Sequence, residues 1–506
     1  MKSQFSPHLT GKASFAFLIL AFCIAPLLFL FAQQNPAQQS PAVSLTQISS
    51  DPFTIGPGQH ATEVEPHMLA FGSTLVAAFQ TGRIAPGGST DIGWATSTDG
   101  GSTWSHGFLP GLTKAEGNGP YDAASDPAVA YDAKHSVWLI ASLPISNTSA
   151  TPAVVVNRST DGGFTWGNAV SVGPKVESSD KNWIACDTWS SSSHYGNCYM
   201  EWDDPFTGDG ILMSTSTDGG LTWGSAISIN AFGLGGQPLV QPNGNVIVPY
   251  FDGGMASFGS GNGGGTWTSS VSIAGVQART DAGGIRSGPL PSAAVDGSGT
   301  IWVVWEDCRF RSNCSTNDLV YSTSTDGRHW SAVKRIPIDP VSSTLDHFIP
   351  GVGIDPATSG ATAHVAVHFY AYPKASCSAS TCQLYVGYIS SPNGGTTWHS
   401  PVRIAGPMQL SWLPDSQNGL MVGDYIATVF TNGAPHGVFA IAAAKSGSTF
   451  NEAMYTAQGL SIPSDGAVLS SAGDKPLHHL SDKIEKERPE KGVIPPTKRA
   501  AKRSQK

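Results

Sequence analysis

The sequence has few charged residues and lacks an excess of positive charge. Asp, Glu, Lys and Arg make up 13% of the 506 residues, and the formal net charge is −9. Residues 33–473 carry 16 Lys and Arg against 32 Asp and Glu. A domain of that charge repels a phosphate backbone, so we exclude nucleic acid as a partner. The same field disfavours an anionic ligand unless a local group of arginines reverses it.

Motifs of the common cofactor and hydrolase sites are also lacking. The chain has no G-x-S-x-G, no H-E-x-x-H, no P-loop and no Rossmann fingerprint. Its cysteines do not show the C-x-x-C spacing of a zinc site, and its 14 histidines are scattered. We therefore predict neither a cofactor nor a metal ion.

Helix-length apolar periodicities are few, and an eight-residue segment, S-T-D-G-G-x-T-W, recurs instead. Its Asp can bond its own backbone, Gly-Gly supplies positive φ, and Trp provides an apolar plug. Strand-like runs flank the copies, so we predict a hairpin turn between two strands. Six occurrences indicate a structural role for the Asp and the Trp. The full copies are Ser97–Trp104, Ser159–Trp166 and Ser216–Trp223, and the weaker copies are Ser260–Trp267, Ser324–Trp330 and Ser391–Trp398.

The copies follow one another at intervals of 44 to 68 residues, which predicts a repeat array. Four strand-like runs per unit are typical of a β-propeller. A seventh unit without the turn, Met421–Gln458, has three such runs, and Ala42–Ile48 is the candidate for its missing outer strand. Pairing the two ends would remove the exposed sheet edges. We favour an all-β propeller of seven four-stranded blades. Six blades is the alternative, with Met421–Gln458 completing the sixth.

The repeated segment resembles the Asp box, or bacterial neuraminidase repeat, of the sialidase superfamily. The resemblance covers about Glu65–Trp398 and is more specific for a propeller than for an activity. Retaining sialidases hold the substrate carboxylate with three arginines, because guanidinium groups bind carboxylates through two parallel hydrogen bonds. Their nucleophile is a Tyr that needs an adjacent base, and an Asp is the acid/base. The resemblance implies Arg83 as one arginine, Asp91 as the acid/base, and Tyr425 or Tyr250 as the nucleophile.

Polar residues recur beside proline at the starts of the predicted inner strands. Inner strands line the channel of a propeller, so these residues are candidates for one mouth of it. The alternative is that they cap strand ends. Where the family has Arg-Ile-Pro, this chain has Glu65-Pro66-His67, and a carboxylate there repels an anionic substrate. Arg286 and Arg309 are further candidates for ligand binding. The candidates for the channel mouth are Glu65, Asp126, Asp180, Gln237, His347 and Asp424.

The ends of the chain differ in composition from its middle. Phe15–Ala32 is an apolar run that follows Lys2 and Lys12, as in a signal peptide, with a membrane anchor as the alternative. We divide the chain into this segment (1–32), the propeller (33–460) and a disordered charged tail (461–506). Six cysteines form local pairs, which predicts three disulfides in an exported, secreted or periplasmic protein. The pairs are Cys186/Cys198, Cys308/Cys314 and Cys377/Cys382.

Two functions stay open. The first is a secreted sialidase-like glycosidase that acts on glycans. The second is a non-catalytic propeller that binds glycan or protein through its channel face. In both cases we expect a monomer whose partner is a glycan or glycoconjugate, with membrane contact only through an uncleaved N-terminal segment. The number of arginines that converge at the channel mouth discriminates between the two.

Overall fold

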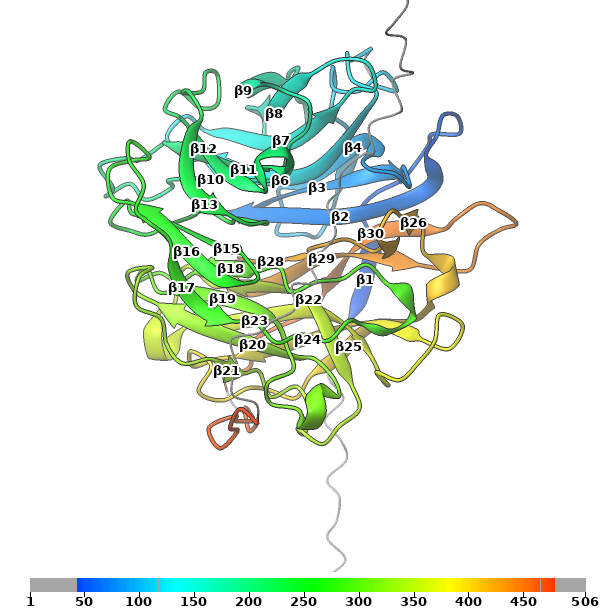
Figure 1. Ribbon diagram of the computed structural model, residues 1–506, viewed down its shortest axis with the longest axis vertical. Coiled ribbons are helices and arrows are strands. Elements are labelled where there is room, and N and C mark those ends of the chain that lie inside the picture. Colours follow the sequence, from blue (N-terminus) through cyan, green and yellow to red (C-terminus); the bar gives the residue numbers. More distant parts are fainter. Residues whose placement is uncertain (1–42, 117, 465, 478–506) are drawn as a thin grey trace, which may run out of the picture. The chain divides into compact units, whose positions relative to one another are not determined.

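The computed structural model of the protein describes residues 43–116, 118–464 and 466–477 (Figure 1). The predicted signal peptide or anchor and the basic end of the tail lie outside these residues. Among the described residues, no helix is long and apolar enough to cross a membrane. The helices described are single 3-10 turns: η1 (Pro205–Thr207), η2 (Ala282–Gly284), η3 (Ser312–Cys314), η4 (Gly360–Thr362) and η5 (Leu410–Trp412).

Antiparallel strands make up nearly all the regular structure, in seven successive meanders of four strands, here sheets 1 to 7. This confirms the predicted all-β class. A small hairpin, β26 (Asp415–Ser416) and β27 (Gly419–Leu420), lies between sheets 6 and 7 in the chain.

Sheets 1 to 4 come first in the chain, and sheets 1 and 2 are joined by the Ser89–Ala124 pair. Sheet 1 holds β2 (Gln59–Phe71), β3 (Thr74–Arg83), β4 (Ser89–Ser97) and β5 (Ser105–Phe108). Sheet 2 holds β6 (Ala123–Asp132), β7 (Val137–Ile145), β8 (Thr151–Ser159) and β9 (Val170–Val176). Sheet 3 holds β10 (Asp180–Cys186), β11 (Cys198–Asp204), β12 (Gly210–Ser216) and β13 (Ile227–Phe232). Sheet 4 holds β14 (Leu239–Val240), β15 (Val246–Phe251), β16 (Gly254–Ser260) and β17 (Val271–Gly275).

Sheets 5 to 7 repeat the same meander. Sheet 5 holds β18 (Ser292–Val295), β19 (Ile301–Asp307), β20 (Asp318–Ser324) and β21 (Lys334–Arg335). Sheet 6 holds β22 (Asp346–Ile354), β23 (Val365–Tyr372), β24 (Gln383–Ser391) and β25 (Val402–Gln409). Sheet 7 holds β28 (Ala427–Thr431), β29 (Ala434–Ala442), β30 (Glu452–Gln458) and, from the start of the described chain, β1 (Ser44–Gln47).

The outer strand of sheet 7 comes from the opposite end of the chain, as the sequence predicts. Strand β1 pairs antiparallel with β30, with Ser44 opposite Gln458 and Gln47 opposite Tyr455. This pairing covers the edge of β30 that would otherwise be free to pair with another chain.

The first strands of the seven sheets contact one another in sequence. β2 contacts β6, β6 contacts β10, and the series continues through β14, β18, β22 and β28 back to β2. Residues that are far apart in the chain but lie on these strands therefore meet at the centre of this series.

The recurring segments form the predicted hairpin turns between the third and fourth strands of sheets 1 to 6. In the second copy, Asp161 Oδ1 accepts hydrogen bonds from Ser159 Oγ at 2.8 Å and from the Thr165 amide at 3.0 Å. The Trp166 indole donates to the Gly163 carbonyl at 3.0 Å. Gly163 has φ of +87°, a conformation that glycine adopts without strain.

The Trp of a turn packs between neighbouring sheets. Trp166 of sheet 2 shares a buried cluster with Val76 and Trp94 of sheet 1, and the Trp94 and Trp166 ring centroids are 6.4 Å apart. Each repeat thus covers apolar surface that its neighbour cannot bury alone. The Asp and the Trp of the recurring turns therefore have the structural role that the sequence predicts.

The three predicted disulfides are present. Cys186–Cys198 joins opposite residues of β10 and β11. Cys308–Cys314 and Cys377–Cys382 close short loops after β19 and β23.

Part of the predicted tail lies against the sheets. The Leu469 carbonyl accepts a hydrogen bond from the Trp398 amide at 2.8 Å, the Asp474 carboxylate lies 3.4 Å from Arg335, and the Leu477 amide donates to the Arg309 carbonyl at 2.8 Å. The tail therefore contacts sheets 5 and 6 as far as residue 477.

Candidate functional site

Four of the first strands share a two-residue bulge at the centre of the molecule. The register of β2, β6, β10 and β22 shifts at Glu65-Pro66, Asp126-Pro127, Lys181-Asn182 and Ile349-Pro350. The first residue of each bulge has a left-handed φ, between +47° and +54°. Such a conformation is strained for a residue other than glycine and persists only where its surroundings hold it.

The residues at three of these bulges meet in a cluster of charges. We define the central charge cluster as Glu65, Asp126, Lys181, Arg286 and Asp424. The Lys181 ammonium lies 3.1 Å from Asp126 Oδ1 and 3.5 Å from Glu65 Oε1, and it also pairs with Asp424. Arg286 binds the same Asp424 carboxylate through two bonds, with Nε donating to Oδ1 at 2.6 Å and Nη2 donating to Oδ2 at 2.5 Å.

These charges are buried, and each has opposite charges beside it. Burial and the neighbouring Asp126 raise the pKa of Glu65 to about 8. Burial opposes the charge of Lys181, but Asp126, Asp424 and Glu65 hold its pKa well above the ordinary value. The pKa of Asp424 is lowered because Arg286 and Lys181 outweigh its burial. Two cations thus face three carboxyl groups, of which Glu65 has a raised pKa, so the cluster carries little net charge near neutral pH.

A second guanidinium lies beside the cluster without being part of it. Arg83 Nη1 donates to Gln80 Oε1 at 2.9 Å and to the Gly88 carbonyl at 3.0 Å. The Gln80 amide in turn donates to Glu65 and to Ser125 Oγ. Burial and the nearby Arg286 lower the pKa of Arg83. Two arginines thus converge here, and both already bind acceptors of the protein.

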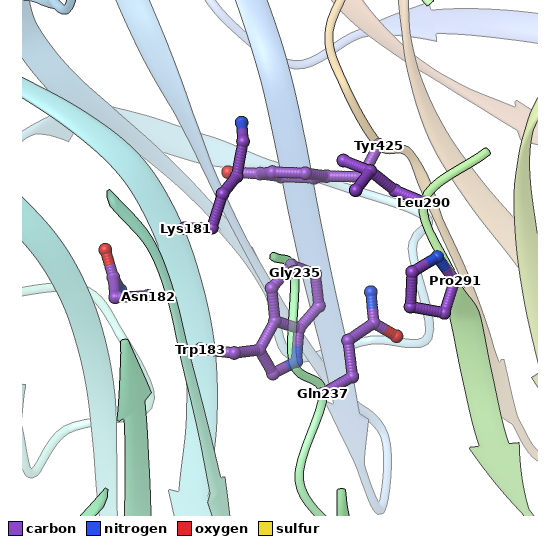
Figure 2. Close-up of a pocket in the computed structure, with 8 residues that line it drawn as sticks. All are labelled: Lys181, Asn182, Trp183, Gly235, Gln237, Leu290, Pro291 and Tyr425. Atoms are coloured by element: carbon purple, nitrogen blue, oxygen red, sulfur yellow. The ribbon is translucent and has the colours of Figure 1, made fainter. Parts of the chain in front are cut away.

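A small cavity borders the cluster (Figure 2). Its two aromatic walls, Trp183 and Tyr425, meet edge to face with ring centroids 5.1 Å apart. The Tyr425 hydroxyl donates to the Pro127 carbonyl at 3.4 Å, and burial raises its pKa well above the ordinary range. The other lining residues are Lys181, Asn182, Gly235, Gln237, Leu290 and Pro291.

Three further carboxylates lie on β10 and β11 near the cavity. Asp180 is opposite Asp203 and Trp183 is opposite Glu201 in the strand pairing. Burial raises the pKa of Asp180 to about 6, although Lys181 acts in the opposite direction. Burial also raises the pKa of Glu201 and of Asp203 well above the ordinary value. The Glu201 carboxyl lies directly against Gly236, between the lining residues Gly235 and Gln237.

The predicted site residues divide into two groups. Glu65, Arg83, Asp126, Asp180, Arg286, Asp424 and Tyr425 come together at the centre, and Gln237 lines the cavity.

Asp91, Arg309 and His347 lie elsewhere. Asp91 is fully buried and accepts hydrogen bonds from the Ile92 amide at 2.7 Å and Thr113 Oγ1 at 2.9 Å. Arg309 pairs with Asp307 in its own loop. His347 Nδ1 lies 3.2 Å from the Asn317 carbonyl.

The bulges explain which residue of each strand reaches the centre. The sequence places Asp180 and His347 beside Glu65 and Asp126, whereas the structure has Lys181 and Ile349 in the equivalent left-handed positions. Lys181 was not among the predicted site residues, although it pairs with Glu65 of sheet 1 and with Asp126 of sheet 2. Placing the strands in register at their bulges, rather than at their polar residues, brings Lys181 into the position of Glu65 and Asp126.

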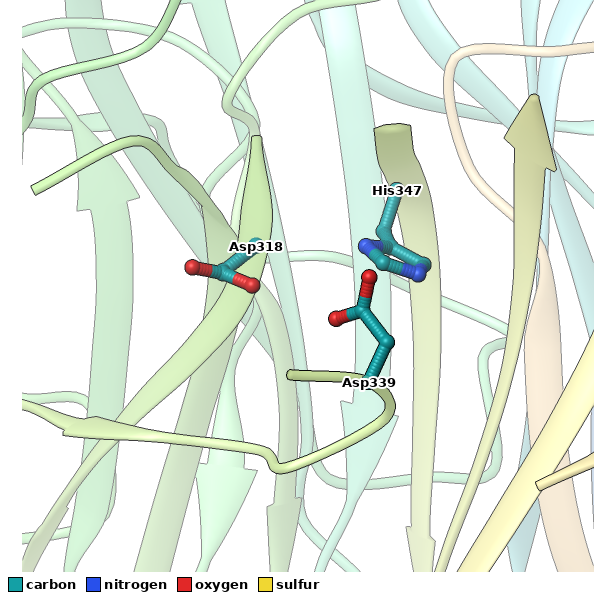
Figure 3. Close-up of side chains that lie close together, drawn as sticks. All are labelled: Asp318, Asp339 and His347. Carbon is teal, nitrogen blue, oxygen red and sulfur yellow. The ribbon is translucent and has the colours of Figure 1, made fainter. Parts of the chain in front are cut away.

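His347 belongs to a different group of side chains, with Asp318 and Asp339 (Figure 3). One possible ligand atom from each lies within 4.8 Å of the others, as in a metal site. Arg311 and Arg335 both pair with Asp318 and with Asp339, at 2.5 to 2.8 Å. The two guanidinium groups supply the positive charge that a metal ion would bring, so the group is a salt-bridge network.

Comparisons with known proteins find distant structural likenesses only. No family model matches the chain, and no curated protein matches it. Among solved structures, the Hadza microbial sialidase Hz136 is 13% identical, with a TM-score of 0.41 over 79% of this chain and 66% of that one. The NanB sialidase from Streptococcus pneumoniae is 16% identical, with a TM-score of 0.39 over 82% and 70%. An ulvan lyase is 11% identical, with a TM-score of 0.47 over 81% and 95%. These values are too low to transfer an activity or a substrate.

Proposed function

We propose that the chain is an exported, seven-bladed β-propeller with Asp-box turns that binds a glycan without cleaving sialosides. The contacts of the seven first strands, from β2 round to β28 and back, support seven blades closed into a ring. The recurring turns, with the same bonds from Ser to Asp and from Gly to Ser, support the Asp-box assignment. Three disulfides agree with an oxidising compartment.

The lining of the cavity is the observation that carries glycan binding. Trp183 and Tyr425 offer aromatic surface of the kind on which sugar C–H groups pack, and Gln237 and Asn182 offer carboxamides that both donate and accept hydrogen bonds. Ligand sites combine mostly apolar walls with a few placed polar groups in this way.

The state of the catalytic candidates disfavours sialoside cleavage. A Tyr nucleophile needs an adjacent base and a lowered pKa, whereas the pKa of Tyr425 is raised and its hydroxyl donates to a carbonyl. An acid/base must reach the scissile oxygen, whereas Asp91 is sealed by Thr113 and its own strand. Arg286 is held by Asp424, and Glu65 occupies the place of the first family arginine.

A glycoside hydrolase acting on uncharged substrates is the second candidate, favoured by one observation. Asp180 and Asp203 are opposed on neighbouring strands, and burial raises the pKa of both. Pairs of carboxyl groups supply the acid and base of most glycosidases.

A glycan array with the full chain tests the proposal. We expect binding to a restricted set of glycans, and its loss in Trp183→Ala. Phe206→Ala is the matched control, because Phe206 is an aromatic residue with 68% of its surface exposed. Equal binding by both variants would contradict the assignment of the cavity. Release of reducing sugar from a bound glycan, abolished by Asp180→Asn, would favour the hydrolase instead.

A further inference from the structure

We infer that the site beside Trp183 prefers uncharged sugars and discriminates against sugars with a carboxylate, an inference that rests on the proposed glycan binding. The inference concerns the specificity of the site. It follows from how the charges next to the cavity are already paired, from the chemistry of the cavity walls, and from the cost of burying an unpaired charge.

Of the three cations at the centre, only Lys181 is among the residues that line the cavity, so an acidic sugar would meet no guanidinium group there. Carboxylates are recognised best by two parallel hydrogen bonds from one guanidinium group. Arg286 already makes that pair of bonds with Asp424, at 2.6 and 2.5 Å. Arg83 is not among the lining residues, and its Nη1 donates to Gln80 and to the Gly88 carbonyl. Its Nε has no hydrogen-bond partner among the described residues.

The Lys181 ammonium is equally occupied. It lies among the carboxylates of Glu65, Asp126 and Asp424, and Figure 2 shows it directed away from Gln237 and Pro291 on the far wall. An anionic ligand would have to displace one of these carboxylates or stay unpaired. Both alternatives leave a buried charge without a partner, which is costly.

A cationic sugar is also disfavoured. Lys181 lies on the cavity wall with its ammonium 5.9 Å from the centre of the Tyr425 ring, so the ring face that would attract a cation already has one. A ligand ammonium group at this place would meet like charge.

The remaining polar groups of the wall suit hydroxyl and acetamido substituents. Gln237 uses its Oε1 to accept from the Ala293 amide at 2.9 Å, and Figure 2 shows its amide nitrogen pointing toward Tyr425 across the cavity. The Asn182 amide is buried, and neither its Oδ1 nor its Nδ2 has a hydrogen-bond partner among the described residues. Unpaired buried amides are costly, and a ligand with both donors and acceptors would satisfy them.

Matched sugars of different charge provide the test. Methyl glycosides of glucose, galactose and N-acetylglucosamine, with methyl glucuronide, methyl galacturonide and methyl glucosaminide as charged counterparts, are titrated into the full chain and followed by ligand-observed NMR. We expect at least one uncharged glycoside to bind more tightly than its charged counterpart by about tenfold or more. Tighter binding of a uronide would overturn the inference while leaving glycan binding intact. Absence of binding by every sugar here and by every glycan on the array would instead contradict the proposed function.

A substitution in the cluster tests the physical cause. Asp424→Asn removes the carboxylate that pairs with Arg286 and with Lys181. The preference of this variant should therefore shift toward the uronide by about tenfold relative to the parent protein. Asp252→Asn, at an exposed carboxylate in the β15–β16 turn, is the control and should shift nothing. Asp126→Asn, which removes a different carboxylate partner of Lys181, should shift the preference the same way if Asp424→Asn does not fold. An unchanged preference in a folded variant would show that charge pairing does not set the specificity.

Discussion

Carboxyl groups of the turns and carboxyl groups buried between the strands, such as Glu63 and Asp91, have opposite properties. In the first turn, the Thr103 amide and hydroxyl hold the pKa of the exposed Asp99 at about 2. On β2, burial raises the pKa of Glu63 to about 8, and on β4 it does the same for Asp91. Hydrogen bonds to the charged form dominate in one place and loss of solvent dominates in the other. The role of a carboxyl group therefore depends on its surroundings and does not follow from the sequence motif alone.

The largest effect on stability is expected when Lys181, the cation shared by the central carboxyl groups, is replaced. Lys181→Met leaves Glu65, Asp126 and Asp424 together without their shared ammonium group. We expect a loss of about 3–5 kcal/mol in the free energy of unfolding, the cost of an uncompensated buried charge. Urea unfolding measures it, with the exposed Lys175→Met as the control. A loss no larger than that of the control would mean that the cluster does not hold the centre together.

A smaller effect is expected in the dependence of stability on pH. Burial raises the pKa of Glu63 from 4.5 in the unfolded chain to about 8 in the folded chain. The folded state thus binds the proton more tightly, so this contribution to stability is complete below pH 4.5 and is lost as the pH rises through 8. Glu63→Gln should flatten the fall in stability between pH 5 and 8.

The comparison of unfolding curves at several pH values checks this expectation. Glu177→Gln, at an exposed carboxylate, should keep the slope of the parent protein. A Glu63→Gln slope identical to that of the parent would contradict a neutral, buried Glu63.

The turns should show the smallest effect and a graded one. Asp161 accepts bonds from the Ser159 hydroxyl and from the Phe164 and Thr165 amides at 2.8 to 3.0 Å, but it is largely open to solvent. Asp161→Ala should cost about 1 kcal/mol of unfolding free energy. Asp161→Asn should cost less, because Asn262 accepts the equivalent bonds in the fourth turn. Equal losses in the two variants, measured by thermal unfolding, would show that charge rather than acceptor geometry stabilises the turn.

Much of the fold was predictable because its signals are local. The turn is specified by hydrogen bonds within eight residues, and strand β1 is recognisable because sheet 7 lacks an outer strand. The centre was less predictable, because each bulge displaces the residue that points inward by one or two positions. Asp180 and His347 were therefore expected where Lys181 and Ile349 lie, and the pairing of Arg286 with Asp424, 138 residues apart, had no local signal.

Hydrolysis of a fluorogenic sialoside by the full chain tests most directly whether the carboxylates and phenol of the centre are structural. The parent protein, Asp91→Asn and Tyr425→Phe should all release product at the rate of the buffer blank. Asp91 is buried and hydrogen-bonded to Thr113, and the Tyr425 hydroxyl is hydrogen-bonded to the Pro127 carbonyl. Turnover by the parent protein that disappears in either variant would contradict this account and identify a working sialidase.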